Sequence, residues 1–331
     1  MWTYFHLSEI TIGLSQVNPS STVDVSRILL DARSLNASEP RDKIFALQGM
    51  LKTMGARFVA PDYTTPTEKV YTEATEAAII HDRTLRILTG ITGHRKIDKM
   101  PSWVPDYSDS DSITEVDEWE EYQAAGTRSI FPPKVMSTRG ELKLEGFAID
   151  RISQLLTAFS IVQDLREPHQ LAKELRWPLE QDLLPREEYL DFLRKLALPT
   201  WEASKHKWPL ASIIRRLLGE VRTAEVSKIL AETLHPIREN LIKRFDRKVL
   251  CRTHNGRLCL VSIFAKQHDT LALLAGCNLP MVLRAADSDW TLVAPAYIYS
   301  TPGSDEARNV MDGSLWTYLH TAETPRQFTV I

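Results

Sequence analysis

Apolar residues recur every three to four positions in three early segments of the chain, over 23–35, 38–52 and 66–89. This spacing predicts three helices. Ser38 is placed to open the second helix, and residues 65–68 (TPTE) are typical of a helix start because they combine a capping residue, a proline and a glutamate. The first hundred residues are therefore expected to be mainly helical.

The pattern changes twice further along the chain. Residues 164–247 return to helical spacing, and their prolines predict several short helices, with Pro236 kinking or splitting the last one. Between 248 and 300, short apolar runs separated by turn residues predict antiparallel strands or a small barrel. We expect an α+β fold in which N-terminal and central helices pack with a C-terminal antiparallel, barrel-like β-rich region.

One strand is expected before the helical block. Residues 141–147 alternate apolar and charged side chains, as a half-buried strand does, and a second strand or a helix start follows over 149–156. The expected organisation is a helical segment over 1–135 and one continuous region over 136–300 that forms a single domain with it. Residues 301–331 are interpreted as a C-terminal tail.

Charge and hydropathy limit the partners of the protein. The 331 residues include 40 basic and 43 acidic side chains, so the net charge of −3 creates no general attraction to nucleic acid or to an anionic membrane. No apolar stretch is long enough for a spanning helix, and Glu9 interrupts the only candidate for a secretory signal. We expect a cytoplasmic protein without a nucleic-acid partner or a membrane span, while homo-oligomerisation stays open.

The sequence offers no pattern for a cofactor or a metal. Cys251, Cys259 and Cys277 match neither a zinc ligand set nor a redox pair, and they are expected to be reduced and buried. The nine histidines have no metal-ligand spacing, and no phosphate-binding or nucleophile motif is present. The expectation is therefore no cofactor and no metal.

The most suggestive segment for chemistry is 100–107 (MPSWVPDY). Two prolines stiffen a turn that presents an indole, a carboxylate and a phenol together. Trp103 and Tyr107 are candidate walls of a site for an apolar substrate, and Asp106 is a candidate catalytic group that polarises it. Alternatively, Trp103 packs in the core while Asp106 caps a neighbouring backbone segment.

Four further residues complete the candidate site. Arg284 and Tyr297 are candidate catalytic polarisers, and Tyr63 and His268 are candidate substrate contacts. Each also has a structural interpretation: Arg284 can pair with Asp269, and His268 can be an exposed turn residue. The neighbourhood of Tyr63 can equally be a network of arginine and aspartate side chains that connects helix ends.

Four segments carry a resemblance to a known family. They are residues 41–47 (RDKIFAL), the PDY of 61–63 followed by Val70-Tyr71, residues 100–107, and several apolar, glycine and arginine positions between 265 and 297. In order and spacing these segments resemble the C-terminal part of fungal heterokaryon-incompatibility (HET) domain proteins. The N-terminal elements that define the HET domain do not precede them in this sequence, which implies a scaffold without that activity.

Two functions are compatible with this resemblance. The first is a cofactor-independent enzyme of fungal secondary metabolism, an isomerase or lyase that folds a polyene or terpenoid-like substrate for a cyclisation of the Diels–Alder type. The second is a truncated heterokaryon-incompatibility module that binds a partner in allorecognition without catalysis. An enclosed apolar cavity is expected of the first, and an exposed apolar patch of the second.

Overall fold

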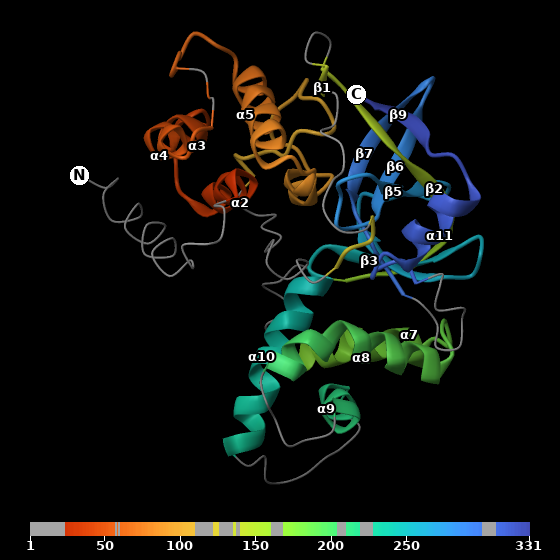
Figure 1. Cartoon of the computed structure of the whole chain (residues 1–331). Helices are drawn as coiled ribbons and strands as arrows, with labels where there is room; N and C mark the ends of the chain where they lie inside the picture. The colour runs from red at the N-terminus through yellow and green to blue at the C-terminus, as the bar shows by residue number, and fades with distance from the viewer. Residues whose placement is uncertain are drawn as a thin grey trace.

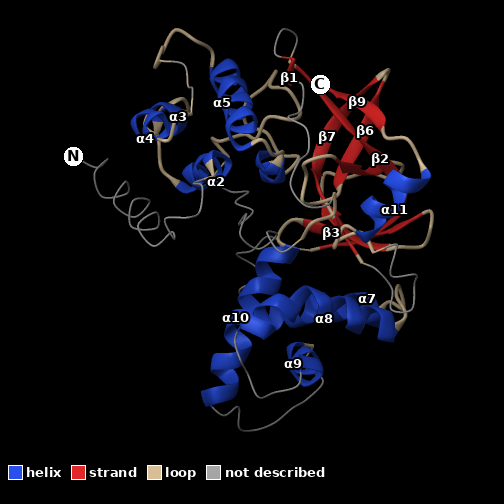
Figure 2. Ribbon diagram, viewed as in Figure 1, coloured by secondary structure: helices blue, strands red, loops and turns tan. Residues whose placement is uncertain are grey.

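The computed structural model describes residues 24–56, 58, 60–109, 122–125, 135–136, 140–159, 168–203, 210–218, 228–299 and 309–331. Within these ranges the protein has the predicted α+β fold (Figures 1 and 2). A closed barrel of five strands, with extra strands extending from it, lies between two groups of helices. The fold class predicted from the residue pattern is confirmed.

The N-terminal group contains short helices and one long one: α2 (Val25–Asp31), η1 (Ala32–Ser34), α3 (Asp42–Phe45), α4 (Gln48–Thr53), α5 (Thr67–Asp82) and η2 (Arg86–Gly90). The predicted helix over 38–52 begins later, at Asp42, and is divided into α3 and α4. The predicted helix over 66–89 stops at Asp82, because Arg83 has a left-handed backbone with φ of 55°.

The strands are β1 (Val135–Met136), β2 (Glu141–Ala158), β3 (Lys248–Thr253), β4 (Leu258–Ser262), β5 (Thr270–Leu274), β6 (Met281–Ala286), β7 (Asp289–Pro295), β8 (Tyr297–Ile298) and β9 (Arg326–Val330). β2 is a single strand of 18 residues, where two elements were expected. Its first part pairs with β9 and β5, and its last part pairs with β3. Its pairing with β5 shifts register between Ala148 and Asp150 and continues to Arg151, and its pairing with β3 begins at Ile152.

The C-terminal residues close the barrel. β9 pairs antiparallel with β2 and parallel with β7, where Trp290 faces Val330. Phe328 and Val330 are fully buried at alternate positions of β9, so their side chains enter the core between the strands. The segment 301–331, expected to be a tail, instead supplies α11 (Ser314–Ala322) and this last strand.

A second group of helices packs against the other side of the sheet: α7 (Pro168–Glu180), α8 (Arg186–Ala203), α9 (Leu210–Leu217) and α10 (Lys228–Phe245). α10 continues through Pro236, so the expected split is absent. Every residue of β5 is buried: Leu271 and Leu273 join the core of this second group, whereas Ala272 and Leu274 join the core of the N-terminal helices. Two cores therefore share one sheet, which explains the continuous apolar runs of its strands.

Candidate functional site

Trp103 and Tyr107 lie in the interior of the N-terminal core. Both side chains are fully buried. Trp103 Nε1 donates a hydrogen bond of 2.7 Å to the carbonyl oxygen of Gly140, and the Tyr107 hydroxyl lies 2.9 Å from Thr75 Oγ1 on α5. Burial raises the pKa of Tyr107. These contacts are structural, so the prediction that the two rings form walls of a substrate site is not supported by their positions.

Asp106 holds a loop in place. Its carboxylate accepts hydrogen bonds from the backbone nitrogens of Lys96, Ile97 and Ser108, at 2.6, 3.0 and 2.9 Å, and another from the Ser108 hydroxyl. Two carboxylate oxygens offer about four lone pairs, and four donors occupy them. Asp106 therefore caps neighbouring backbone groups, as the alternative interpretation of the sequence expected. No lone pair of its carboxylate is left to polarise a substrate.

Arg284 pairs with a carboxylate. Its Nε and Nη2 lie 2.9 and 2.7 Å from the two oxygens of Asp269, and Nη2 also donates to the carbonyl oxygen of Phe264 at 2.8 Å. Asp269 is 4% exposed, and its Oδ2 accepts in addition from the backbone nitrogen of Lys266. This forked ion pair joins β6 to the turn before β5, so Arg284 matches the structural alternative to catalysis.

Tyr297 and His268 complete the predicted set and lie apart from each other. Tyr297 is 5% exposed, and its ring lies between those of Tyr122 and Phe192, at centroid distances of 5.6 and 6.0 Å. His268 is exposed in a turn, with φ of 72°, and its ring stacks on His254. The structure does not bring Asp106, Arg284 and Tyr297 together.

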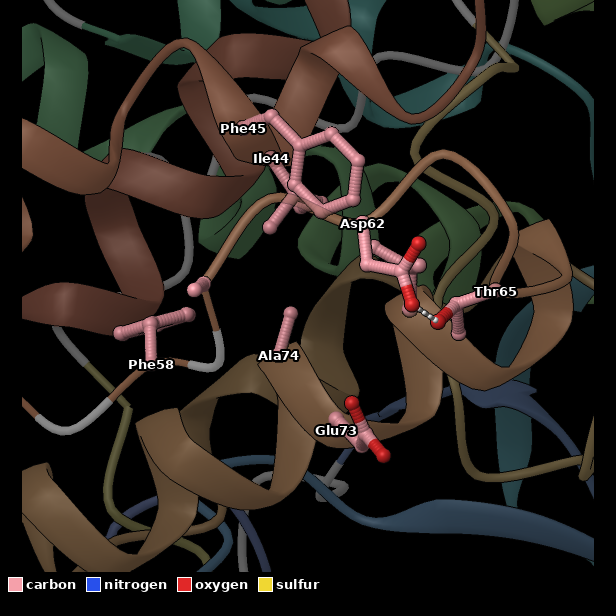
Figure 3. A pocket seen from close by; sticks show the side chains of 9 residues that line it. Ile44, Phe45, Phe58, Asp62, Thr65, Glu73 and Ala74 are labelled. Atoms are coloured by element: carbon pink, nitrogen blue, oxygen red, sulfur yellow. Dashed lines mark hydrogen bonds between the residues drawn. The ribbon is translucent and has the colours of Figure 1, made fainter.

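Tyr63 lies elsewhere, beside a hollow between α3, α5 and the loop that joins α4 to α5, where its ring contacts Phe45 of the lining. We call this hollow the α3–α5 notch. It is lined by Ile44, Phe45, Phe58, Ala60, Asp62, Thr65, Val70, Glu73 and Ala74 (Figure 3). Figure 3 shows these side chains approaching one space from three segments. Residues from the segments 41–47 and 61–63 therefore meet here.

Arg41 and Asp42 fix the rim of the notch. Arg41 donates to the carbonyl oxygens of Tyr63 and Thr65, and its Nε lies 2.7 Å from Glu39. The Tyr63 hydroxyl donates to Asp42 at 2.6 Å, while the ring contacts Phe45 edge-on at a centroid distance of 5.2 Å. The network of arginine and aspartate groups considered from the sequence exists, and it holds Tyr63 in place although the residue is 56% exposed.

The size of the notch limits what it can bind. Its volume is about 20 Å³, which is room for one water molecule or the end of one side chain. Sites for small organic ligands occupy roughly 300–1,000 Å³. A larger hollow of about 420 Å³ lies on the barrel, but Asp150, Arg151, His254 and Arg326 are among its lining residues. Neither hollow has the enclosed apolar lining that a polyene substrate requires.

The sequence did not single out several residues of the notch. Glu73 and Ala74 follow the helical spacing of α5 like any other surface and core positions, and Phe58 stands alone in a short extended stretch. In the sequence, these residues are marked only by lying near the segments 41–47 and 61–63. The burial of Ala74 and the partial burial of Glu73 become apparent only when α3 packs across α5.

In the part of the chain that the structure describes, no group of three or more histidine, cysteine, aspartate or glutamate side chains could hold a metal ion. No helix in the same ranges is both long and apolar enough to cross a bilayer. The three cysteines are free thiols in the core, and burial raises the pKa of Cys259 and of Cys277.

Two neighbouring carboxyl groups, Asp24 before α2 and Asp82 at the end of α5, lie outside both hollows. Asp24 caps the helix and pairs with Arg86 at 2.7 Å, while Asp82 accepts from the backbone nitrogen and hydroxyl of Ser26, at 2.7 and 2.6 Å. Burial, together with a hydrogen bond to Asp82, raises the pKa of Asp24 to about 6. A hydrogen bond to Asp82 also raises the pKa of His81.

This pair makes stability depend on pH. Because the folded-state pKa of Asp24 exceeds its ordinary value of 3.8, its stabilisation is complete below that pH and is lost as pH rises through about 6. His81 acts in the same direction near neutrality. Relative to the variant Asp24→Asn, which keeps a capping side chain, the wild type should lose roughly 2 kcal/mol of unfolding free energy between about pH 4 and about pH 7.

Urea denaturation of both proteins across this pH range measures the difference. Parallel pH profiles for wild type and Asp24→Asn would show that the two carboxyl groups do not share a proton in the folded protein. Asp82→Asn is a second test, because burial raises the pKa of Asp82 but its hydrogen bonds lower it overall. Asp82 also raises the pKa of Asp24 and of His81, so this variant should reduce the loss of stability near pH 6 as well as change stability on the acid side.

Comparison with known proteins found no match. No protein family model, no curated protein and no solved structure matches the chain.

Proposed function

We propose that this chain is a protein-binding module, built on a scaffold similar to that of HET proteins, which uses the α3–α5 notch to hold a basic and aliphatic segment of a partner protein. The observation that carries the proposal is the state of Tyr63. This residue is 56% exposed, yet its hydroxyl, its ring and its backbone carbonyl are each held by a neighbour. An exposed aromatic ring that is already ordered loses little entropy when a partner covers it.

The chemistry of the rim indicates the partner. Asp62 and Glu73 line the notch beside apolar side chains. Hydrogen bonds from Thr64 lower the pKa of Asp62, so its carboxylate stays charged. Among the described residues, the cation within ion-pair distance of Glu73 is Lys69, at 3.8 Å. A lysine or arginine side chain satisfies both requirements, since its aliphatic stem covers apolar surface while its charge reaches the carboxylates.

The alternative, a cyclase for a polyene, stays a prediction. It needs an enclosed apolar cavity, with orienting groups around one substrate. Its proposed catalytic residues lie in separate places: Asp106 in the N-terminal core, Arg284 in an ion pair, and Tyr297 in the core with α8. The interaction module needs only a surface, so the observed geometry favours it.

Selection from a displayed peptide library tests the proposal without knowledge of the natural partner. The wild-type chain should enrich peptides in which Lys or Arg is adjacent to Leu, Ile or Val, and Tyr63→Ala and Glu73→Lys should each weaken binding of those peptides by about tenfold or more. Fluorescence polarisation with the enriched peptides measures the loss. Ile80→Ala is a matched control, because Ile80 is 65% exposed and lies on α5 outside the notch.

Two results would contradict the proposal. Enrichment that is equal for wild type and for Tyr63→Ala would place the binding elsewhere, and failure to enrich any basic and aliphatic sequence would remove the proposed partner class. Tyr63→Phe separates the contribution of the ring contact to affinity from that of the fixed ring position. It keeps the ring but loses the hydrogen bond to Asp42. An intermediate loss of affinity is expected for this variant.

A further inference from the structure

The larger hollow lies on the barrel, where β2 changes partners. Residues 148–151 of β2, Thr270 of β5, His254 of the β3–β4 turn and Arg326 of β9 line it. β9 begins at Arg326, opposite Gly146 of β2, and β3 ends at Thr253, opposite Ile152 of β2. An opening of about 420 Å³ remains beside β2 between these two strands. We call it the barrel groove. Its volume is within the range of small-ligand sites.

Two guanidinium groups line the barrel groove. Arg151 and Arg326 are both exposed. Both line the same hollow, so their like charges repel. Burial, and then the charge of Arg151, lower the pKa of Arg326. Among the residues that the structure describes, neither has a carboxylate within ion-pair distance. A bound anion would remove this repulsion.

Arg326 is held ready for such a ligand. Its guanidinium lies over the rings of Phe328 and Trp290, at 4.4 and 5.4 Å from their centroids. These two contacts restrict the position of the guanidinium group beside the rings. A ligand that binds Arg326 therefore has to order this side chain less than a fully free arginine.

Two histidines and one carboxylate lie in or beside the lining of the barrel groove. The backbone nitrogens of His254 and His268 donate to the carbonyl oxygens of Arg151 and Ile152, at 3.0 and 2.8 Å, so both turns are attached to β2. The two exposed imidazoles stack on each other at 6.1 Å. Asp150 also lines the groove, and its Oδ1 accepts from the Arg151 backbone nitrogen at 2.8 Å. One carboxylate against two guanidinium groups leaves an excess of positive charge.

We propose that the barrel groove binds a small phosphomonoester, with Arg151 and Arg326 as the groups that hold the phosphate and His254 as an additional donor. A phosphate group has three oxygens and up to two negative charges, which match two forked donors better than the two oxygens of one carboxylate do. The groove is larger than a phosphate ion, so the remaining volume accommodates the group to which the phosphate is attached. The inference does not depend on the α3–α5 notch.

Calorimetric titration of the full chain tests this assignment, with inorganic phosphate, a hexose phosphate and succinate as probes at one ionic strength. The hexose phosphate should bind most tightly, inorganic phosphate more weakly, and succinate weakest. Arg151→Gln and Arg326→Gln should each weaken binding of hexose phosphate by about tenfold. Arg215→Gln, an equal change of charge at an exposed position of α9, should stay within about twofold of the wild type.

Arg326→Lys distinguishes a lost phosphate contact from a loss of folding. It keeps the charge and an apolar stem over Phe328 but loses the fork, and affinity between those of wild type and Arg326→Gln is expected. Three results would overturn the proposal: no heat from either phosphate probe up to about 10 mM, succinate binding as tightly as hexose phosphate, or equal affinities for Arg151→Gln and Arg215→Gln. Thermal unfolding of each variant confirms that it is folded.

Discussion

Replacement of Trp103 by alanine is expected to lower the free energy of unfolding by about 3–5 kcal/mol. The indole is fully buried in the core between the N-terminal helices and the barrel, so its removal leaves a cavity that rigid neighbours cannot fill. The carbonyl oxygen of Gly140 also loses its donor. Chemical denaturation of the purified variant measures the change.

Trp177→Ala is the control for this prediction. Trp177 lies on α7 and is 37% exposed, so its loss should change stability by less than about 1 kcal/mol. Trp103→Phe keeps much of the buried volume without the N–H donor, and a loss of about 1–3 kcal/mol is expected. If Trp103→Ala were as stable as the wild type while losing a ligand, the ring would be a wall of a binding site after all.

Replacement of Gly146 by alanine is expected to destabilise the barrel by about 3 kcal/mol or more. A β-carbon at this position would lie 2.1 Å from the carbonyl oxygen of Leu273 and 3.1 Å from its carbonyl carbon, which are backbone atoms of β5. Backbone atoms inside a sheet cannot move away without breaking the pairing of Gly146 with Leu274. The glycine is therefore required because the paired strands β2 and β5 approach each other closely at this position.

Gly49→Ala is the matched control. Gly49 lies in α4, and a β-carbon there would meet nothing within 4 Å. This variant should gain about 0.5–1 kcal/mol, because alanine loses less conformational freedom than glycine in a helix. Hydrogen exchange at the amides of β5 and thermal unfolding distinguish the two variants. Equal rates of amide hydrogen exchange in Gly146→Ala and in the wild type would contradict the close approach of β2 and β5 at this position.

These two variants also bear on function. A loss of binding or activity in Trp103→Ala has a structural cause unless the variant remains folded, so it cannot by itself identify a substrate site. Tyr63→Ala and Arg151→Gln are better probes, because both side chains are exposed and neither is part of a buried core. Their effects on stability should be within about 1 kcal/mol, which allows binding to be measured on folded protein.

The sequence by itself determined the fold class and most of the elements. Helical spacing predicted α2 and α5, and short apolar runs with turn residues predicted β3 to β7, because these patterns arise from which side of a local element is buried. The same reasoning offered the correct alternatives for Asp106 and Arg284, since a carboxylate beside a turn and an arginine at a strand end usually find nearby partners.

Only the tertiary structure decided how distant segments combine. Closure of the barrel by β9, the uninterrupted length of β2, and the burial of Trp103 depend on contacts between residues far apart in the chain, which no local pattern encodes. The same holds for both hollows. Arg151 and Arg326 are 175 positions apart in the numbering (326 − 151), and they become neighbours only because β2 and β9 pair beside each other in the closed sheet.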